Sequence, residues 1–103
     1  ANVKQVVGKL QPDLSSWVYT TTFGTNSPIP NISPVAFLVD RCENVYISGW
    51  GGAGFATGFT SAGVTGMRTT PDAFKPTPDP VGKDFYFFVL KRDATDILFG
   101  SFF

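Results

Sequence analysis

The chain has 103 residues, of which 43% are hydrophobic and 16% aromatic, and its eight Lys and Arg residues balance eight Asp and Glu residues. This length allows one small folded domain at most, and the scattered basic residues leave no charged surface for nucleic acid. With no His and the single Cys42, the chain lacks the usual zinc ligand sets and cannot form an internal disulfide. No apolar run approaches the ~18 residues of a membrane span. We therefore expect no cofactor, no metal, no nucleic acid and no membrane insertion.

Glycine and proline interrupt every stretch that might show helical periodicity, so the expected fold is nearly all-β. Runs of β-branched and aromatic residues predict six strands: Val3–Leu10, Trp17–Phe23, Val35–Val39, Val45–Trp50, Phe85–Lys91 and Ile97–Phe103. Short polar connections at 11–16, 40–44 and 92–96 predict antiparallel hairpins. Two longer connections, the proline-rich 24–34 and the glycine-rich 51–84, are expected to be loops. A loop as long as 51–84 is typical of a binding loop or an insertion on one face of a repeat.

The chain contains an internal repeat. Residues 9–13, which lead into 17–24, are echoed by residues 90–93, which lead into 97–103, so that Tyr19 aligns with Phe99 at an offset of 80 residues. The chain is therefore expected to be a piece of an array that starts and stops at the same hairpin. Four strands ending in a repeated hairpin describe one blade of a β-propeller. This predicts about one and a half blades: 1–24 as the outer hairpin of a preceding blade, and 25–103 as one complete four-stranded antiparallel blade with the loop insertion at 51–84. Residues 35–39 would be innermost and 97–103 outermost.

The same segments carry a family resemblance. Residues 40–46 with Gly49, then 69–74, then 84–91 resemble the bacterial SBBP β-propeller repeat. More narrowly, residues 31–40 and 84–93 are similar to segments of large gliding-motility-associated surface proteins of Bacteroidetes, which leave the cell by type IX secretion. Two departures stand out, because Cys42-Glu43 occupies a turn that is usually small or glycine-containing, and the stretch from Gly49 to Thr70 is longer than usual. The resemblance implies a secreted or cell-surface bacterial repeat protein.

The candidate ligand site is the aromatic part of the glycine-rich stretch. Residues 49–55 lack the strand-to-helix context and the Lys-Ser/Thr pair of a phosphate loop. Trp50, Phe55 and Phe59 could instead stack on sugar rings or on a protein partner. The alternative, which we favour, is that these aromatic residues pack between blades.

Other polar residues have structural interpretations. The spacing of known calcium loops is absent, so a group of carboxylates is expected to be solvated turn residues: Glu43, Asp72, Asp79 and Asp84. Asp40 and Asn44 are expected to stabilise their own turn. Cys42 has no His to act as its base, which argues against a catalytic thiol. The sequence Asn31-Ile32-Ser33 fits the N-glycosylation pattern.

These observations favour a non-catalytic structural and binding module that acts in adhesion, display or partner binding, with other blades or identical chains as partners and a carbohydrate or protein as ligand. A second hypothesis is self-assembly into a ring or filament through strand edges such as Phe85–Leu90, which Tyr86→Ser or Phe88→Ser would disturb. A third is a propeller hydrolase or lyase, which would need catalytic groups from other blades.

Overall fold

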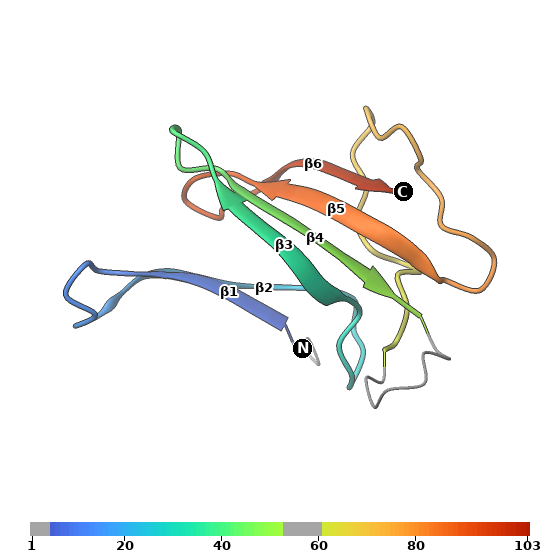
Figure 1. Ribbon diagram of the computed structural model, residues 1–103, viewed down its shortest axis with the longest axis horizontal. Helices are drawn as coiled ribbons and strands as arrows, with labels where there is room; N and C mark the ends of the chain where they lie inside the picture. The colour runs from blue at the N-terminus through green and yellow to red at the C-terminus, as the bar shows by residue number, and fades with distance from the viewer. Residues whose placement is uncertain (1–4, 53–60) are drawn as a thin grey trace.

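The computed structural model describes residues 5–52 and 61–103, and these contain six β-strands and no helix (Figure 1). The strands are β1 (Gln5–Leu10), β2 (Trp17–Phe23), β3 (Ser33–Val39), β4 (Val45–Gly51), β5 (Asp84–Leu90) and β6 (Ile97–Phe102). The prediction of an all-β chain with six strands is confirmed for this part of the chain. No helix among the same residues is long and apolar enough to span a membrane.

The strands form two antiparallel sheets. β1 pairs with β2, while β3, β4, β5 and β6 form a four-stranded sheet in that order. Within each sheet, strands that are consecutive in sequence are neighbours, and three of these pairs are the hairpins that the short polar turns predict. The observed boundaries differ from the predicted ones by one or two residues, and the predicted start of the first strand at Val3 lies outside the described residues.

The prediction that residues 24–34 are entirely loop is wrong at its end. β3 begins at Ser33 and includes Pro34, and the register of β3 against β4 shifts between Pro34 and Ala36. β3 is an edge strand, so the missing N–H of Pro34 can be tolerated there without the loss of an interior ladder bond.

The prediction that Phe85–Leu90 forms an edge strand is also wrong. β5 lies between β4 and β6, and its side chains Tyr86 and Phe88 are only 1% and 0% exposed. The periodicity of a strand reveals which residues share a face but not where the strand lies in its sheet. Substitution of Tyr86 or Phe88 by Ser would therefore damage the core and would not report on an assembly edge.

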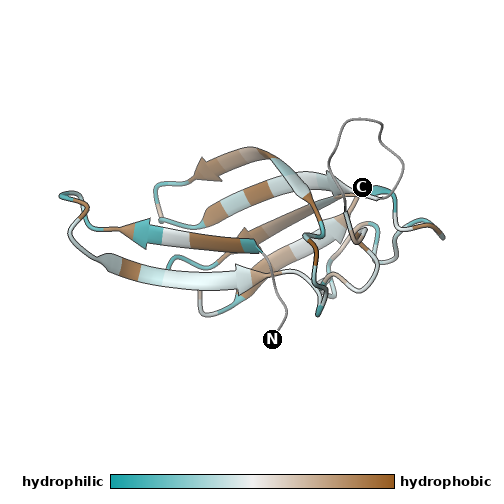
Figure 2. Ribbon diagram, turned by 90° about the horizontal axis from the view of Figure 1, so that it is seen from below, coloured by the Kyte–Doolittle hydropathy of each residue, from teal (hydrophilic) through white to brown (hydrophobic). Residues whose placement is uncertain are grey.

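The two sheets pack face to face around an apolar core. Val7 of β1 and Phe23 of β2 contact a cluster that includes Ile47 of β4 and Phe88 of β5, and the ring centroids of Phe23 and Phe88 are 5.0 Å apart. Figure 2, which views the molecule from below, shows the hairpin as a separate layer. Because side chains alternate along a strand, one face of each sheet supplies this core.

The connection between β4 and β5 spans 52–83, close to the predicted 51–84. Its described part packs against the sheet, since Val64 and Met67 are 0% and 7% exposed. The Thr70 N–H donates to the Gly100 carbonyl and the Phe102 N–H donates to the Lys75 carbonyl, both at 3.0 Å. This segment therefore lies along the outer edge of β6 and covers it.

Candidate interaction surfaces

The internal repeat is present in the structure as the same hairpin built twice. In the β1–β2 hairpin the register shifts between Lys9 and Leu10, and in the β5–β6 hairpin it shifts between Val89 and Leu90. Both turns contain one residue with positive φ, 62° at Leu14 and 58° at Ala94. Each of these features recurs at the predicted offset of 80 residues.

The hydrogen bonds of the two turns also correspond. Ser15 donates to the Asp13 carboxylate from its hydroxyl (2.6 Å) and its amide (3.0 Å), and Thr95 does the same to Asp93 at 2.6 and 3.1 Å. These hydroxyl hydrogen bonds, followed by the amide bonds, lower the pKa of both carboxyl groups from the ordinary value. Local side-chain chemistry thus builds one turn geometry in two places.

The first copy of the hairpin buries one face against the four-stranded sheet. Along β1 and β2, alternate residues are the more protected ones: Gln5, Val7, Lys9, Tyr19, Thr21 and Phe23. Val7 is 9% exposed, whereas its neighbour Val6 is 66% exposed. This alternation identifies the face of the hairpin that contacts the sheet.

Gln5 fixes the position of the hairpin at one end. Its Nε2 donates to the Ile32 carbonyl (2.7 Å), and its Oε1 accepts the N–H groups of Asn31 (3.0 Å) and Ile32 (3.1 Å). At the other end, Lys9 forms an exposed ion pair with Glu43 at 2.8 Å. The three hydrogen bonds of Gln5 contribute more to the docking than this solvent-exposed ion pair.

In the second copy, the equivalent face is partly exposed: Val89 and Ser101, which correspond to Lys9 and Thr21, are 7% and 0% exposed. Shifted by 80 residues, Gln5, Val7, Tyr19 and Phe23 become Phe85, Phe87, Phe99 and Phe103. Phe85 is 46% and Phe103 is 71% exposed. We call this surface, with Leu38 and Tyr46 from the neighbouring strands, the outer face.

The outer face forms a continuous aromatic surface across the sheet. The ring centroids of Tyr46 and Phe87 are 6.3 Å apart, and those of Phe87 and Phe99 are 5.9 Å apart. Leu38, which pairs with Tyr46, is 60% exposed. Lateral contacts of this kind partly bury each ring, and at the end of the outer face Phe74 of the connection packs edge-on against Phe103, with ring centroids 5.2 Å apart. An exposed patch of this kind is typical of a contact surface.

The predicted aromatic ligand loop is only partly described. Trp50 lies on β4 and lines an open pocket of about 270 Å³ with Gly51, Lys83, Phe85 and Phe103 among the other lining residues. Phe55 and Phe59 lie outside the described residues. The structure therefore places Trp50 next to the outer face but does not test whether the three residues act together.

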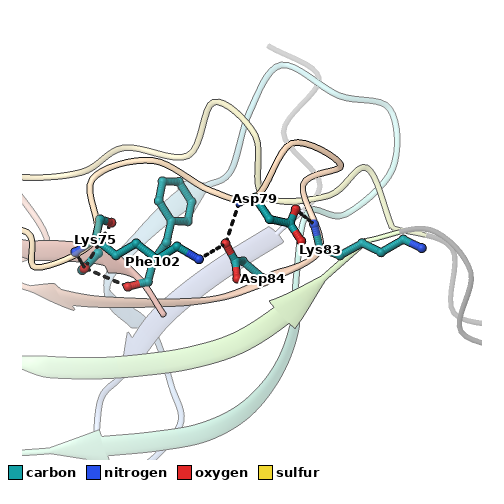
Figure 3. A network of polar contacts seen from close by, with 6 residues as sticks. Lys75, Asp79, Lys83, Asp84 and Phe102 are labelled. Carbon is teal, nitrogen blue, oxygen red and sulfur yellow. Dashed lines mark hydrogen bonds and ion pairs between the residues drawn. The ribbon is translucent and has the colours of Figure 1, made fainter.

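The carboxylates proposed as solvated turn residues do not all behave that way. The side chain of Asp84 is only 11% exposed; it accepts from Lys75 Nζ at 2.7 Å and from the Asp79 N–H at 2.8 Å (Figure 3). The prediction is wrong for Asp84, because its partner Lys75 comes from a distant part of the connection. Asp72 accepts from the Thr70 hydroxyl at 2.5 Å, and Glu43 pairs with Lys9. Among residues 5–52 and 61–103, no three His, Cys, Asp or Glu side chains lie together as a metal site would require.

The other polar predictions concern single residues. Asp40 stabilises its turn as predicted, accepting from the Asn44 N–H (2.9 Å) and the Tyr46 hydroxyl (3.0 Å). Cys42 is exposed in the same turn. Asn31 is 3% exposed, and its side-chain amide donates to the Gly63 carbonyl at 2.8 Å. A buried amide engaged in this way cannot serve as a glycosylation acceptor in the folded chain.

Sequence reasoning missed the outer face and the role of Gln5. The outer face has a signal in the sequence, because the 80-residue offset combined with the alternation of strand residues maps the buried face of the first hairpin onto Phe85, Phe87 and Phe99. Gln5 gives no such signal, since a polar residue at the start of a strand is unremarkable.

Comparison with protein-family models, curated proteins and solved structures finds no match for this chain.

Proposed function

We propose that the chain is a non-catalytic structural and binding module of a secreted or cell-surface bacterial repeat protein, in which β3–β6 form one blade of a β-propeller. In this proposal β1–β2 are the outer hairpin of the preceding blade. Other blades of the same kind are its first partners. Adhesion, display or the binding of a carbohydrate or protein ligand would be carried by the loops, and by the aromatic residues near Trp50.

One observation carries the proposal: the same hairpin occurs twice, and its first copy packs on a four-stranded sheet. The outer face of the second copy is equivalent to the face that β1–β2 buries. A further unit like β3–β6 could pack on this outer face as the present one packs on β1–β2. The strand order β3-β4-β5-β6 is also the order that a propeller blade requires. The SBBP resemblance of residues 40–46 and 84–91 supports the same assignment.

A tandem chain tests the proposal. A second copy of residues 24–103 is appended after Phe103, so that Phe103 takes the place that Phe23 has in the first unit. We expect a single cooperative unfolding transition and a higher free energy of unfolding than that of the present chain, because neighbouring repeats stabilise one another through their interface. Two independent transitions, one of them at the midpoint of the present chain, would contradict the proposal.

The new interface between the two units of the tandem chain lacks one set of hydrogen bonds, and this makes the test specific. In the new interface, Phe85 of the first unit would take the position that Gln5 has where β1–β2 packs on the sheet. The hydrogen bonds to the backbone of Asn31 and Ile32 of the second unit would therefore be missing. Phe85→Gln in the first unit should restore them and stabilise the tandem chain. In the present chain, where Phe85 is 46% exposed, the same substitution should bring no comparable gain and serves as the control.

Self-assembly of identical chains remains the second candidate, now through the outer face instead of the Phe85–Leu90 edge. The exposure of Phe103 and Leu38 favours it, because two copies could bury their outer faces against each other across a twofold axis. Light scattering over a range of concentrations would show a dimer that Leu38→Ser weakens. A monomer at all concentrations would exclude this candidate. No arrangement of the described residues favours the third candidate, a propeller hydrolase or lyase.

A further inference from the structure

The β1–β2 sheet has a strand edge that no described residue fills. β1 has β2 as its single neighbour in the sheet. The Gln11 N–H donates across the hairpin to the Ser16 carbonyl at 2.9 Å. Backbone polar groups alternate in direction along a strand, so those of Val7 also face β2. The backbone N–H and C=O groups of Val6, Gly8 and Leu10 therefore point away from β2, to the side of β1 that has no neighbouring strand among the described residues.

The edges of the four-stranded sheet are protected, whereas this one is not. Thr70 and Lys75 cover the outer edge of β6 through backbone hydrogen bonds, and β3 has Pro34 and a register shift. These are common ways of preventing a strand edge from pairing with another chain. Val6, Gly8 and Leu10 include neither a charge nor a proline. The free edge of β1 is thus chemically suited to pairing.

The repeat identifies what this edge would pair with. β1 corresponds to β5, and the corresponding edge of β5 is occupied by β4. In that ladder Tyr86, Phe88 and Leu90 lie opposite Gly49, Ile47 and Val45. With the offset of 80 residues, Tyr86, Phe88 and Leu90 correspond to Val6, Gly8 and Leu10. Residues equivalent to Gly49, Ile47 and Val45 would therefore lie opposite these three residues of β1.

An apolar groove lies beside the free edge. It has a volume of about 280 Å³, and its lining is mostly apolar, with Val7, Tyr19, Phe37 and Val39 beside the ion pair of Lys9 and Glu43. Phe37 and Val39 are 63% and 50% exposed, although they share a face with the buried core residues Ile47 and Val45. A strand added to β1 would direct alternate side chains toward this groove and cover it.

We propose that the free edge of β1 accepts an antiparallel β-strand with the character of Val45–Gly51, contributed by a neighbouring repeat. The assignment rests on the proposed function, since the repeat supplies both the strand and its register. Residues corresponding to Val45, Ile47 and Gly49 hydrogen-bond to β1, and those corresponding to Tyr46, Ser48 and Trp50 face the groove side. This interaction is β-strand addition, in which backbone hydrogen bonds give affinity and register gives specificity.

A synthetic peptide tests the proposal on the full chain. The probe is residues 43–52 with a fluorophore and two solubilising lysines, and binding is followed by fluorescence anisotropy. A peptide N-methylated at Ile47 loses a hydrogen bond to β1 and should bind about tenfold more weakly. The matched control is N-methylated at Ser48, whose amide points away from β1, and it should bind as the parent peptide does. Equal binding of both methylated peptides, or no binding of the parent, would overturn the proposal.

Amide hydrogen exchange locates the bound peptide. We expect slower exchange at Val6, Gly8 and Leu10, and protection confined to another strand would contradict the proposed site. Val6→Pro removes an edge donor that β2 does not use and should abolish binding, whereas Val6→Thr keeps the donor and should not. A stabilised tandem chain together with a failed peptide test would reject this site alone, whereas failure of the tandem chain would reject the proposed function.

Discussion

The two faces of β5 should respond very differently to substitution. Phe88 is fully buried, and its ring centroid lies 5.0 Å from that of Phe23 and 5.4 Å from that of Tyr86. Phe88→Ala removes these contacts and leaves a cavity between the hairpin and the sheet. Such a substitution costs about 3–5 kcal/mol. A domain of this size has a total stability of about 5–15 kcal/mol, so the substitution should remove a large share of the total stability.

Phe85, on the opposite face of the same strand, provides the comparison. Phe85 is 46% exposed, so Phe85→Ala leaves no enclosed cavity and should cost about 1 kcal/mol. Urea unfolding followed by tryptophan fluorescence gives both free energies, and thermal unfolding should show a difference of at least about 8 °C between the variants. Equal losses for the two substitutions would refute the assignment of the inner and outer faces.

Two further predictions concern Gln5 and Tyr86. Gln5→Leu leaves the Asn31 and Ile32 backbone groups without their partner and should cost about 1–3 kcal/mol; amide exchange at both residues should accelerate, and unchanged exchange would show that Gln5 does not fix the hairpin. Burial raises the pKa of Tyr86 from 10.0 to about 12. The folded state therefore retains this proton longer than the unfolded state, and the free energy of unfolding should fall as the pH rises from 10 to 12, by at most ~1.4 kcal/mol per pH unit. Denaturant titrations at several pH values should show a weaker decline for Tyr86→Phe, and an identical slope would contradict this assignment.

The strands and the repeat could be predicted because their signals are local. Turn residues such as Asp13 and Asp93 act on their own backbone, and the alternation of apolar residues sets the faces of each strand. Local signals decide neither whether β5 lies at an edge or inside its sheet, which the assembly and blade hypotheses placed differently, nor the pairing of Asp84 with Lys75. Both depend on where the long connection 52–83 returns, and packing determines that path.

The surfaces were harder to predict than the strands for a related reason. Trp50, Phe55 and Phe59 were selected because aromatic residues in a glycine-rich stretch can form a ligand site. In the described structure β4 includes Trp50, as the predicted strand Val45–Trp50 does, and continues to Gly51, with the outer face beside it. The alternation along β5 and the 80-residue offset contain the information needed to find that face, but only once the packing of the first hairpin is known.

The central claim is that the outer face receives a further repeat, and the structure of the tandem chain tests it most directly. In the tandem chain, Phe103 should pack on Phe88 of the second unit, as Phe23 packs on Phe88 in the present chain, where the two ring centroids are 5.0 Å apart. Phe87 and Phe99 should then be covered by the second sheet. A structure in which Phe103 remains exposed and the second unit lies away from the outer face would contradict the account.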